Sequence, residues 1–352
     1  MDYKKELEDL ILTIIRESGS DLHLGGGRVP VIRITGELIF LVKHPVFTKE
    51  DMIGILSEVL DPVKLAKFLE KKEIDFSYDF RGEARLRGNA FFQKGLISIA
   101  FRLVPVVKPL SDLRLPQIIA DLTRKKQGFF LVVGPVGQGK STTLSAMINL
   151  INNEQARHIV TIEDPIEHVY TPNKSIIDQR EVGVDTEDFH IALKSVFRED
   201  VNVIMIGEMR NVDTISTAVT AAETGHLVLS TLHTNNASQT IDRIIDSFPG
   251  NQQDQIRIQL ASSLLGIFSQ RLIPRIAGGL VPAYELLLNN NAVSNLIREK
   301  RTHEIDVVIE TGMESGMVDL NRSLLELVRA GEISIENAYQ YSLNPKALER
   351  MI

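Results

Sequence analysis

Apolar residues in the first third of the chain recur at two different spacings. Between positions 7 and 15, leucines and isoleucines fall on one face of a helix over residues 3–17, so this helix is expected to dock on a core rather than on a membrane surface. The other elements expected here are a turn and strand over 19–24, a hairpin of strands 31–34 and 37–42 that turns at Thr35 and Gly36, a helix over 48–73 that Thr48 caps, and strands at 84–91 and 96–102. This mixture predicts a small α+β domain that ends near residue 104.

The pattern changes after residue 104. Residues 104–109 hold two prolines and no clear period, so 105–115 is expected to link two domains, 1–104 and 116–352. In the second domain apolar runs alternate with longer helical segments, which is typical of a parallel α/β sheet. The expected strands are 129–133, 159–162, 203–206 and 227–232, and a C-terminal cap of helices is expected after residue 235, at 240–248, 253–272, 292–300, 319–330 and 335–341.

The run Gly134–Ser141 matches the phosphate-binding pattern G-x-x-x-x-G-K-[ST] between an expected strand and an expected helix. Its glycines let backbone N–H groups surround a β-phosphate, Lys140 reaches the β- and γ-phosphate oxygens, and the Ser141 hydroxyl can bind Mg²⁺. The alternative, a glycine-rich turn that binds nothing, does not account for the flanking strand and helix. The candidate nucleotide-binding residues are Gly134, Pro135, Val136, Gly137, Gln138, Gly139, Lys140, Ser141 and Thr142.

Carboxylates follow two further strands, at the edge of a parallel sheet where ligands bind. Glu208 ends the run Val203–Glu208 and is the candidate acid for holding Mg²⁺ directly or through water. Glu163 is the candidate for orienting and deprotonating the attacking water. The alternative is that Glu163 and Asp164 merely cap the turn at Pro165.

Two histidines flank the strand 227–232. His233 follows the strand and is the candidate γ-phosphate sensor, whereas His226 precedes it and is expected to have a structural or interface role. The two cannot both lie at the phosphate-binding edge if the strand is straight.

Charge and composition narrow the function further. The chain has 352 residues and a formal net charge of −7, which argues against a nucleic acid as its main partner. It has no cysteine, so disulfides and thiolate zinc sites are excluded. No apolar run is long enough to span a bilayer, and the charged N-terminus is wrong for a signal peptide. A cytoplasmic protein without direct membrane insertion is expected.

Four sequence boxes together resemble the type II/IV secretion ATPases, and among them the ATPases that retract type IV pili. They are the phosphate-binding loop Gly134–Ser141, the acidic box Thr161–Glu167, the stretch Gly207–Arg210 and the histidine box Thr220–His233. The resemblance extends to both ends of the chain, through Ser20–Leu24, Arg198–Asp200, Ala292–Glu299 and Gly316–Asp319. Three positions differ from the usual family residues: Val136, Gln138 and Asn211.

The resemblance implies an N-terminal PAS-like domain, a RecA-like ATPase domain and a homohexamer that uses ATP and Mg²⁺. It also implies that arginines of the N-terminal domain complete the site, with Arg85, Arg87 and Arg102 at the matching strands and Arg87 and Arg102 favoured. A guanidinium there would neutralise charge on the transferred phosphoryl group. The implied partners are an inner-membrane pilus platform protein and the associated pilus machinery, where the ATPase would act peripherally.

The predicted function is an ATP-hydrolysing motor for pilus retraction. Alternatives within the family are a second retraction-type ATPase, or a pilus extension or type II secretion ATPase; members of the last two groups usually carry a tetracysteine zinc site, which this chain lacks. A nucleotide-gated scaffold with little hydrolysis and a nucleic-acid translocase are alternatives of other classes. Glu163, Glu208 and His233 argue against the scaffold, and the acidic charge argues against the translocase.

Overall fold

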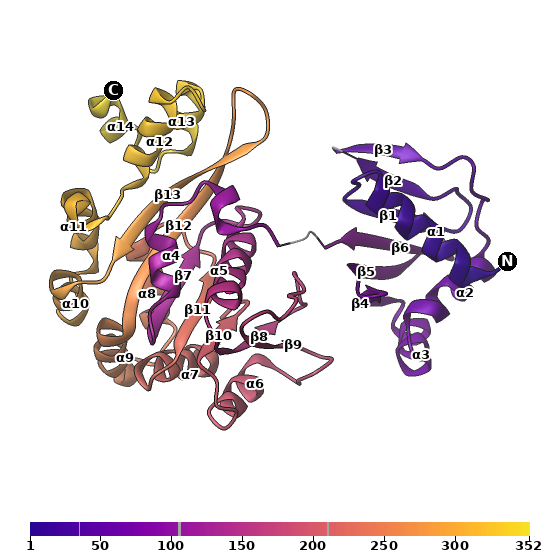
Figure 1. Ribbon diagram of the computed structural model, residues 1–352, viewed down its shortest axis with the longest axis horizontal. Helices are drawn as coiled ribbons and strands as arrows, with labels where there is room; N and C mark the ends of the chain where they lie inside the picture. Colours follow the sequence, from indigo (N-terminus) through magenta and orange to yellow (C-terminus); the bar gives the residue numbers. More distant parts are fainter. Residues whose placement is uncertain (35, 105–106, 210) are drawn as a thin grey trace. The chain divides into compact units, whose positions relative to one another are not determined.

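The computed structural model describes residues 1–34, 36–104, 107–209 and 211–352 (Figure 1). Three sequence predictions fall partly outside this range, since Thr35 of the hairpin turn, residues 105–106 of the expected linker and Arg210 of the Gly207–Arg210 stretch are not described. The chain divides into two compact units. Unit 1 comprises Met1–Val106 with Glu167–Val169, and unit 2 comprises Val107–Ile166 with Tyr170–Ile352.

Unit 1 is a six-stranded antiparallel sheet with three helices. The sheet order is β3-β2-β1-β6-β5-β4. Apolar side chains of α1 and α2 pack with the inward residues of the strands in one buried cluster, which is the burial that the helical spacing near the N-terminus predicted. The elements are α1 (Tyr3–Arg16), β1 (Asp21–Gly25), β2 (Val31–Ile34), β3 (Glu37–Phe40), α2 (Lys49–Val59), α3 (Pro62–Lys71), β4 (Glu73–Phe80), β5 (Ala84–Gln93) and β6 (Leu96–Leu103).

The single helix expected over 48–73 is wrong, because α2 ends at Val59 and α3 begins at Pro62. Proline lacks an N–H and fits the first turn of a new helix, and the Asp61 side chain accepts the N–H of Lys64 as an N-cap. Thr48 caps α2 as predicted. The strand β4, which follows α3, has no counterpart among the elements expected from the sequence.

Unit 2 is built on a seven-stranded sheet of order β13-β12-β7-β11-β10-β8-β9. All neighbours are parallel except β12 and β13, which form an antiparallel hairpin at one edge. The strands are β7 (Gly128–Val133), β8 (His158–Glu163), β9 (Ile176–Glu181), β10 (Val203–Ile206), β11 (Leu227–Leu232), β12 (Leu264–Pro274) and β13 (Leu280–Leu288). The four strands predicted by the apolar runs are β7, β8, β10 and β11, and every residue of β7, β10 and β11 is buried.

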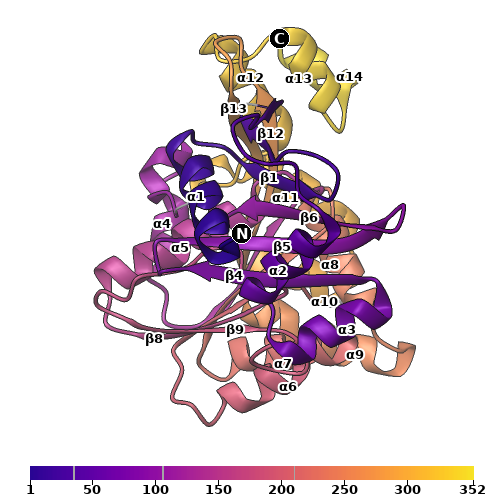
Figure 2. The ribbon, with the colours of Figure 1, turned by 90° about the vertical axis from the view of Figure 1, so that its right-hand side faces the viewer.

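Helices cover both faces of this sheet. On one face α4 (Ile118–Thr123) and α5 (Lys140–Glu154) pack against the strands. The other face is covered by α6 (Phe189–Val196), α7 (Val212–Glu223), α8 (Ala237–Asp246), α9 (Gly250–Ser263), α10 (Asn291–Arg298) and α11 (Ile305–Thr311). The last helices, α12 (Leu320–Arg329), α13 (Ile335–Tyr341) and α14 (Pro345–Met351), gather at the hairpin end of β12 and β13 (Figure 2). Short 3₁₀ turns lie at Leu110–Leu113, Thr302–Glu304 and Met313–Ser315.

The helix expected over 253–272 is wrong in its second half. The helix α9 ends at Ser263, and the residues after it form β12, which pairs with β7 and with β13. Gly266 lies where β13 approaches closely, since a Cβ there would be 2.5 Å from the carbonyl oxygen of Leu287. The C-terminal cap is therefore not wholly helical, and its two strands extend the central sheet.

Candidate functional site

The loop Gly134–Ser141 joins β7 to α5 at the carboxyl edge of the sheet, and two of its glycines are required by geometry. Gly134 has φ +146°, and a Cβ there would lie 2.4 Å from the carbonyl oxygen of Gln270 on β12. Gly139 has φ +78° and is the N-cap of α5, where a Cβ would lie 3.0 Å from Nε2 of Gln270. The loop thus lies directly on β12 and leads into a helix N-terminus, which favours an anionic phosphate.

Gln270 is a contact of this loop that sequence reasoning missed. Its side chain accepts a hydrogen bond from the Thr143 hydroxyl (2.7 Å) and donates one to the carbonyl oxygen of Gln138 (2.8 Å). The Gln138 side chain in turn accepts the backbone N–H of Leu272 at 2.6 Å. Gln138 stands where the family usually has a different residue. Its side-chain amide binds the backbone of β12 and so holds the loop against this strand. A strand at 264–274 was not predicted, so nothing in the sequence pattern placed Gln270 beside the loop.

Lys140 brings two other predicted residues together. Its side chain is buried, and Nζ donates to the carbonyl oxygens of Gly134 and Pro135, both at 2.9 Å. Nζ also lies 3.2 Å from Nδ1 of His233, whose Nε2 is 3.6 Å from Oε1 of Glu208. An ammonium group can only donate, so Nδ1 of His233 is the acceptor in this contact and the other ring nitrogen, Nε2, faces Glu208. Residues from the ends of three strands, β7, β10 and β11, therefore meet at one place.

Glu163 lies at the end of β8 and is buried, with 5% of its surface exposed. Its Oε1 accepts the Thr161 hydroxyl at 2.7 Å and lies 3.4 Å from Nε2 of Gln179 on β9. The backbone of Gly207, just before Glu208, packs against Glu163 and donates its N–H to the carbonyl oxygen of Ile162. The two candidate carboxylates thus stand at adjacent strand ends, with the Glu163 side chain held by hydrogen bonds in a defined orientation.

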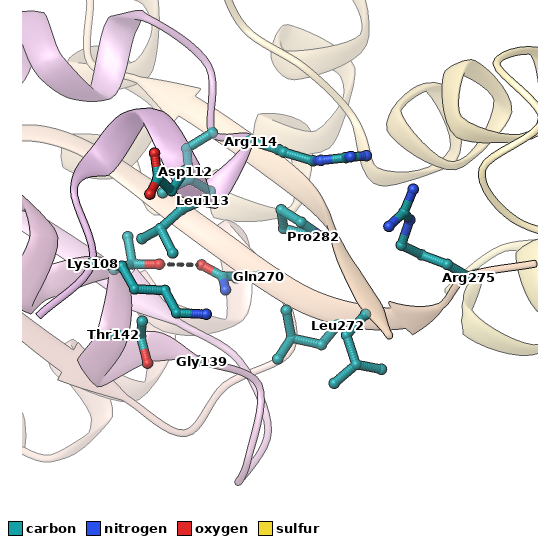
Figure 3. A pocket seen from close by; sticks show the side chains of 13 residues that line it. Lys108, Asp112, Leu113, Arg114, Gly139, Thr142, Gln270, Leu272, Arg275 and Pro282 are labelled. Atoms are coloured by element: carbon teal, nitrogen blue, oxygen red, sulfur yellow. Dashed lines mark hydrogen bonds between the residues drawn. The ribbon is translucent and has the colours of Figure 1, made fainter. Parts of the chain in front are cut away.

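A cavity of about 370 Å³ lies beside the start of α5 (Figure 3). Gly139, Thr142 and Thr143 line one side, while Leu272, Leu280 and Pro282 of the β12–β13 hairpin supply apolar surface. Its remaining lining residues are Lys108, Asp112, Leu113, Arg114, Leu115, Gln270 and Arg275. An apolar wall with charged groups at the rim, next to a phosphate-binding loop, suits the base and ribose of a nucleotide.

Glu332 holds two arginines at the rim of this cavity. Its carboxylate accepts from Arg114 at 2.7 Å and from Arg275 at 2.6 Å. Hydrogen bonds from Arg275 and Arg114 lower the pKa of Glu332 below its ordinary value. Figure 3 shows both guanidinium groups on the side of the cavity toward the C-terminal helices. The loop between α12 and α13 therefore shapes the rim.

In unit 1, the favoured arginines Arg87 and Arg102 lie opposite each other on β5 and β6. Arg102 Nε donates to Asp21 Oδ1 at 2.9 Å, and the Ser20 hydroxyl donates to the other oxygen at 2.7 Å. Burial opposes ionisation of Asp21, but these hydrogen bonds outweigh it and lower the pKa of that carboxyl. Arg85 lies two residues before Arg87 on β5, opposite Asp79 of β4. Asp21 thus fixes Arg102 on the sheet surface beside Arg87.

The remaining predicted residues have simpler surroundings. Val136 is 80% exposed, so its departure from the family pattern alters no packing. The Asn211 side chain accepts the N–H of Thr214 as the N-cap of α7, which an aspartate at that position would also do. His226 precedes β11, and its Nδ1 lies 3.0 Å from the carbonyl oxygen of Ala221 at the end of the strand away from His233.

The donor set at the loop fits Mg²⁺. Ser141 in the first turn of α5 and Glu208 after β10 offer oxygen ligands, which Mg²⁺ prefers. Among the described residues there is no group of three or more histidine, aspartate or glutamate side chains that could hold a metal by themselves. Mg²⁺ usually takes one or two protein ligands and completes its shell with phosphate oxygens and water.

The described residues contain no helix that is long and apolar enough to cross a membrane.

Comparison with known proteins bears on the whole chain. Residues 111–280 match the family model described as type II/IV secretion system protein. The chain is 40% identical to the type IV pilus retraction ATPase PilT of Pseudomonas aeruginosa, over 97% of this chain and 99% of the relative. It is 37% identical to the type IV pilus ATPase PilU of the same organism, over 99% and 91% of the two chains.

A solved structure agrees with the sequence comparison. A crystal structure of the pilus retraction motor PilT with bound ADP superposes with a TM-score of 0.92 at 45% identity, covering 98% of this chain and 99% of that one. The expected fold class, an N-terminal sheet domain followed by a parallel-sheet ATPase domain with C-terminal helices, is confirmed. From its sequence, its fold and the nucleotide-binding loop at the edge of its parallel sheet, the chain belongs to the type II/IV secretion ATPases as a PilT-like member.

Proposed function

We propose that this chain is a Mg²⁺-dependent ATP-hydrolysing motor that drives retraction of type IV pili. The observation that carries the proposal is the meeting of Lys140, His233 and Glu208 at the end of a strand–loop–helix phosphate site. A site that only holds a nucleotide needs the loop and the lysine. A histidine and carboxylates placed next to that lysine serve hydrolysis, because they can sense and act on the terminal phosphate.

The chain's own residues divide the work of hydrolysis. Backbone N–H groups of the loop and Nζ of Lys140 bind the phosphates, and Lys140 exchanges its carbonyl partners Gly134 and Pro135 for phosphate oxygens. Glu163 orients the attacking water and takes its proton as the water oxygen bonds to the γ-phosphorus, and ADP leaves with the electron pair of the broken P–O bond. His233, which lies beside Nζ of Lys140, is proposed to turn from Glu208 to an oxygen of the terminal phosphate when nucleotide binds.

Mg²⁺, held by Ser141 and Glu208, would neutralise phosphate charge when bound. Arg87 and Arg102 of unit 1 are proposed to stabilise the charge of the transferred phosphoryl group. The part of this proposal that concerns Arg102 is supported by its ion pair with Asp21, which orients the guanidinium on the sheet. Arg87 pairs instead with Glu167 at 3.3 Å. Such pre-organised cations are most effective where charge develops in the transition state.

The proposed assembly is a homohexamer at the cytoplasmic face of the inner membrane, docked on the platform protein of the pilus machinery. The likeness over nearly the full length to PilT and PilU, both named as type IV pilus ATPases, supports this setting. Closed rings arise when one surface of a subunit binds a different surface of the next.

Phosphate release tests the enzymatic part. Wild type is expected to release phosphate from ATP in the presence of Mg²⁺, while Lys140→Ala and Glu163→Gln lose at least about a hundredfold in turnover, as expected when a phosphate-binding or proton-accepting group is removed. Wild type no faster than Lys140→Ala would refute hydrolysis and leave a nucleotide-binding scaffold.

Gene deletion tests the motor part. Loss of a retraction motor leaves more surface pili and abolishes twitching, whereas loss of an extension motor leaves none. The chain is nearly as similar to PilU as to PilT, so a second retraction-type ATPase is the alternative to test. For this test the deletion strain is complemented with the Lys140→Ala variant, which is expected not to hydrolyse ATP. If this variant restored wild-type numbers of surface pili, hydrolysis by this chain would not be needed for retraction, which would contradict a role as the main motor.

A further inference from the structure

Glu285 is a carboxylate buried on β13, with 8% of its residue surface exposed. Its Oε1 accepts the backbone N–H of Ala237, the first residue of α8, at 2.7 Å. Backbone N–H groups in the first turn of a helix have no acceptor within the helix, and here the carboxylate of a distant strand is the acceptor for one of them.

The segment that Glu285 holds is the loop 233–236, which carries His233 at its start and leads directly into α8. The same hairpin fastens the middle of this loop: the Ser269 hydroxyl donates to the carbonyl oxygen of Asn235 at 2.8 Å, and Arg271 Nη2 lies 3.5 Å from that oxygen. Three residues separate His233 from Ala237, so the position of the imidazole depends in part on where the start of α8 is held.

Charged groups from each neighbouring element act on Glu285. Burial raises the pKa of Glu285 to about 7; the Ala237 N–H and Arg271 of β12 counteract this, while Asp306 of α11 and Asp319 at the start of α12 add to it. Asp242 in the second turn of α8 accepts the Thr302 hydroxyl at 2.7 Å, and Tyr284 on β13 packs on Phe268 in the cluster of the opposite sheet face. The Ala237 contact is therefore charge-assisted above neutral pH and weaker below it.

We infer that Glu285 is a positioning residue for His233, which holds the histidine loop in place through the N–H of Ala237 and holds it less tightly when the carboxylate takes up a proton. This inference rests on the proposed hydrolytic function for its kinetic consequence. The loop contact itself does not depend on that function. A motor of this kind would slow when the surrounding solution becomes acidic.

Kinetics of Glu285→Gln test the inference. The amide keeps an acceptor oxygen but carries no charge, so this variant mimics the protonated form at every pH. Between about pH 8 and pH 6, the wild-type kcat is expected to fall roughly fivefold, the difference between a charge-assisted and a neutral hydrogen bond. Glu285→Gln is expected to hold the lower value throughout, with KM for ATP unchanged. Glu310→Gln, at an exposed glutamate of α11, is the matched control and should follow the wild type.

Hydrogen exchange of the intact protein supplies a readout that needs no turnover. Protection of the amides in residues 234–240 is expected to fall about fivefold from pH 8 to pH 6 in wild type, after correction for intrinsic exchange, and to stay constant in Glu285→Gln. The inference is wrong if wild type hydrolyses ATP and Glu285→Gln has the same pH profile of kcat as wild type and the control. It is also wrong if the exchange profiles of wild type and Glu285→Gln coincide at both pH values. If wild type releases no phosphate, the proposed function fails, and the exchange result alone decides whether Glu285 holds the loop.

Discussion

Replacement of Glu285 by glutamine is predicted to stabilise the fold while slowing the enzyme. Burial raises the pKa of Glu285 from an ordinary 4.5 to about 7. A group with a raised pKa contributes stability that is fully present below the unfolded pKa and is lost as pH rises through the folded pKa. Ionised Glu285 therefore costs the native state about 3 kcal/mol at pH 8 relative to pH 4.5, since each pKa unit corresponds to about 1.4 kcal/mol. Glutamine removes this cost.

Urea unfolding of wild type and Glu285→Gln measures the effect across about pH 4.5 to pH 8. The chain has no tryptophan, so far-UV circular dichroism is the suitable signal. The free energy of unfolding of the variant, relative to wild type, is expected to rise by about 3 kcal/mol over this range. Glu310→Gln should show no such rise. If the difference in unfolding free energy between Glu285→Gln and wild type stays constant with pH, the link between the raised pKa of Glu285 and stability is refuted. If the more stable variant also has a higher kcat than wild type, Glu285 has only a structural role.

Three further substitutions, and a fourth as a control, test residues of the loop, of β12 and of unit 1. Gly134→Ala places a Cβ 2.4 Å from the carbonyl oxygen of Gln270 and is expected to weaken ADP binding at least about tenfold by displacing the loop. Gly137→Ala adds the backbone strain of a positive φ (+77°) but meets no neighbour within 4 Å, so it should lose less. Equal losses in a calorimetric titration would contradict the close-contact argument. Gln270→Leu leaves the buried Thr143 hydroxyl without its acceptor and should lower the free energy of unfolding by about 1–3 kcal/mol and raise KM for ATP, which chemical denaturation and phosphate release measure. Asp21→Asn removes the charge that orients Arg102 and should reduce kcat with little change in KM; an unchanged kcat would place Arg102 outside the reaction.

Much of the site was predictable because its signals are local in the sequence. The spacing Gly134–Ser141 and the apolar run before it identify a strand, a loop and a helix without any knowledge of distant contacts. The strand ends at Glu163, Glu208 and His233 could be grouped because parallel strands end at the same edge of a sheet. The structure adds that Lys140, His233 and Glu208 form one contact series and that Glu163 is anchored by Thr161.

The errors in the predicted fold come from non-local pairing and from a neglected helix breaker. Pro62 splits the helix expected over 48–73, and this signal was present in the sequence. The strand β12 was mistaken for a continuation of α9 because the apolar spacing of a helix persists beyond Ser263. Only pairing with β7 and β13 makes that segment a strand, and the close approach at Gly266 reflects this pairing. Long-range pairing of this kind can override local preference.

The sequence by itself determined that the chain binds a nucleotide and to which family it is similar, because the loop, the carboxylates and the histidine lie in short motifs whose residue types carry the chemistry. Only the tertiary structure decided what supports them. Gln270 contacts Gln138, and Glu285 holds the loop that begins at His233. Each of these supporting residues lies more than 50 residues further along the chain than the motif residue, on a strand that the sequence did not predict. Their roles arise because the β12–β13 hairpin folds back onto the edge of the sheet, where side chains far along the chain meet the loops that hold the phosphate-binding residues.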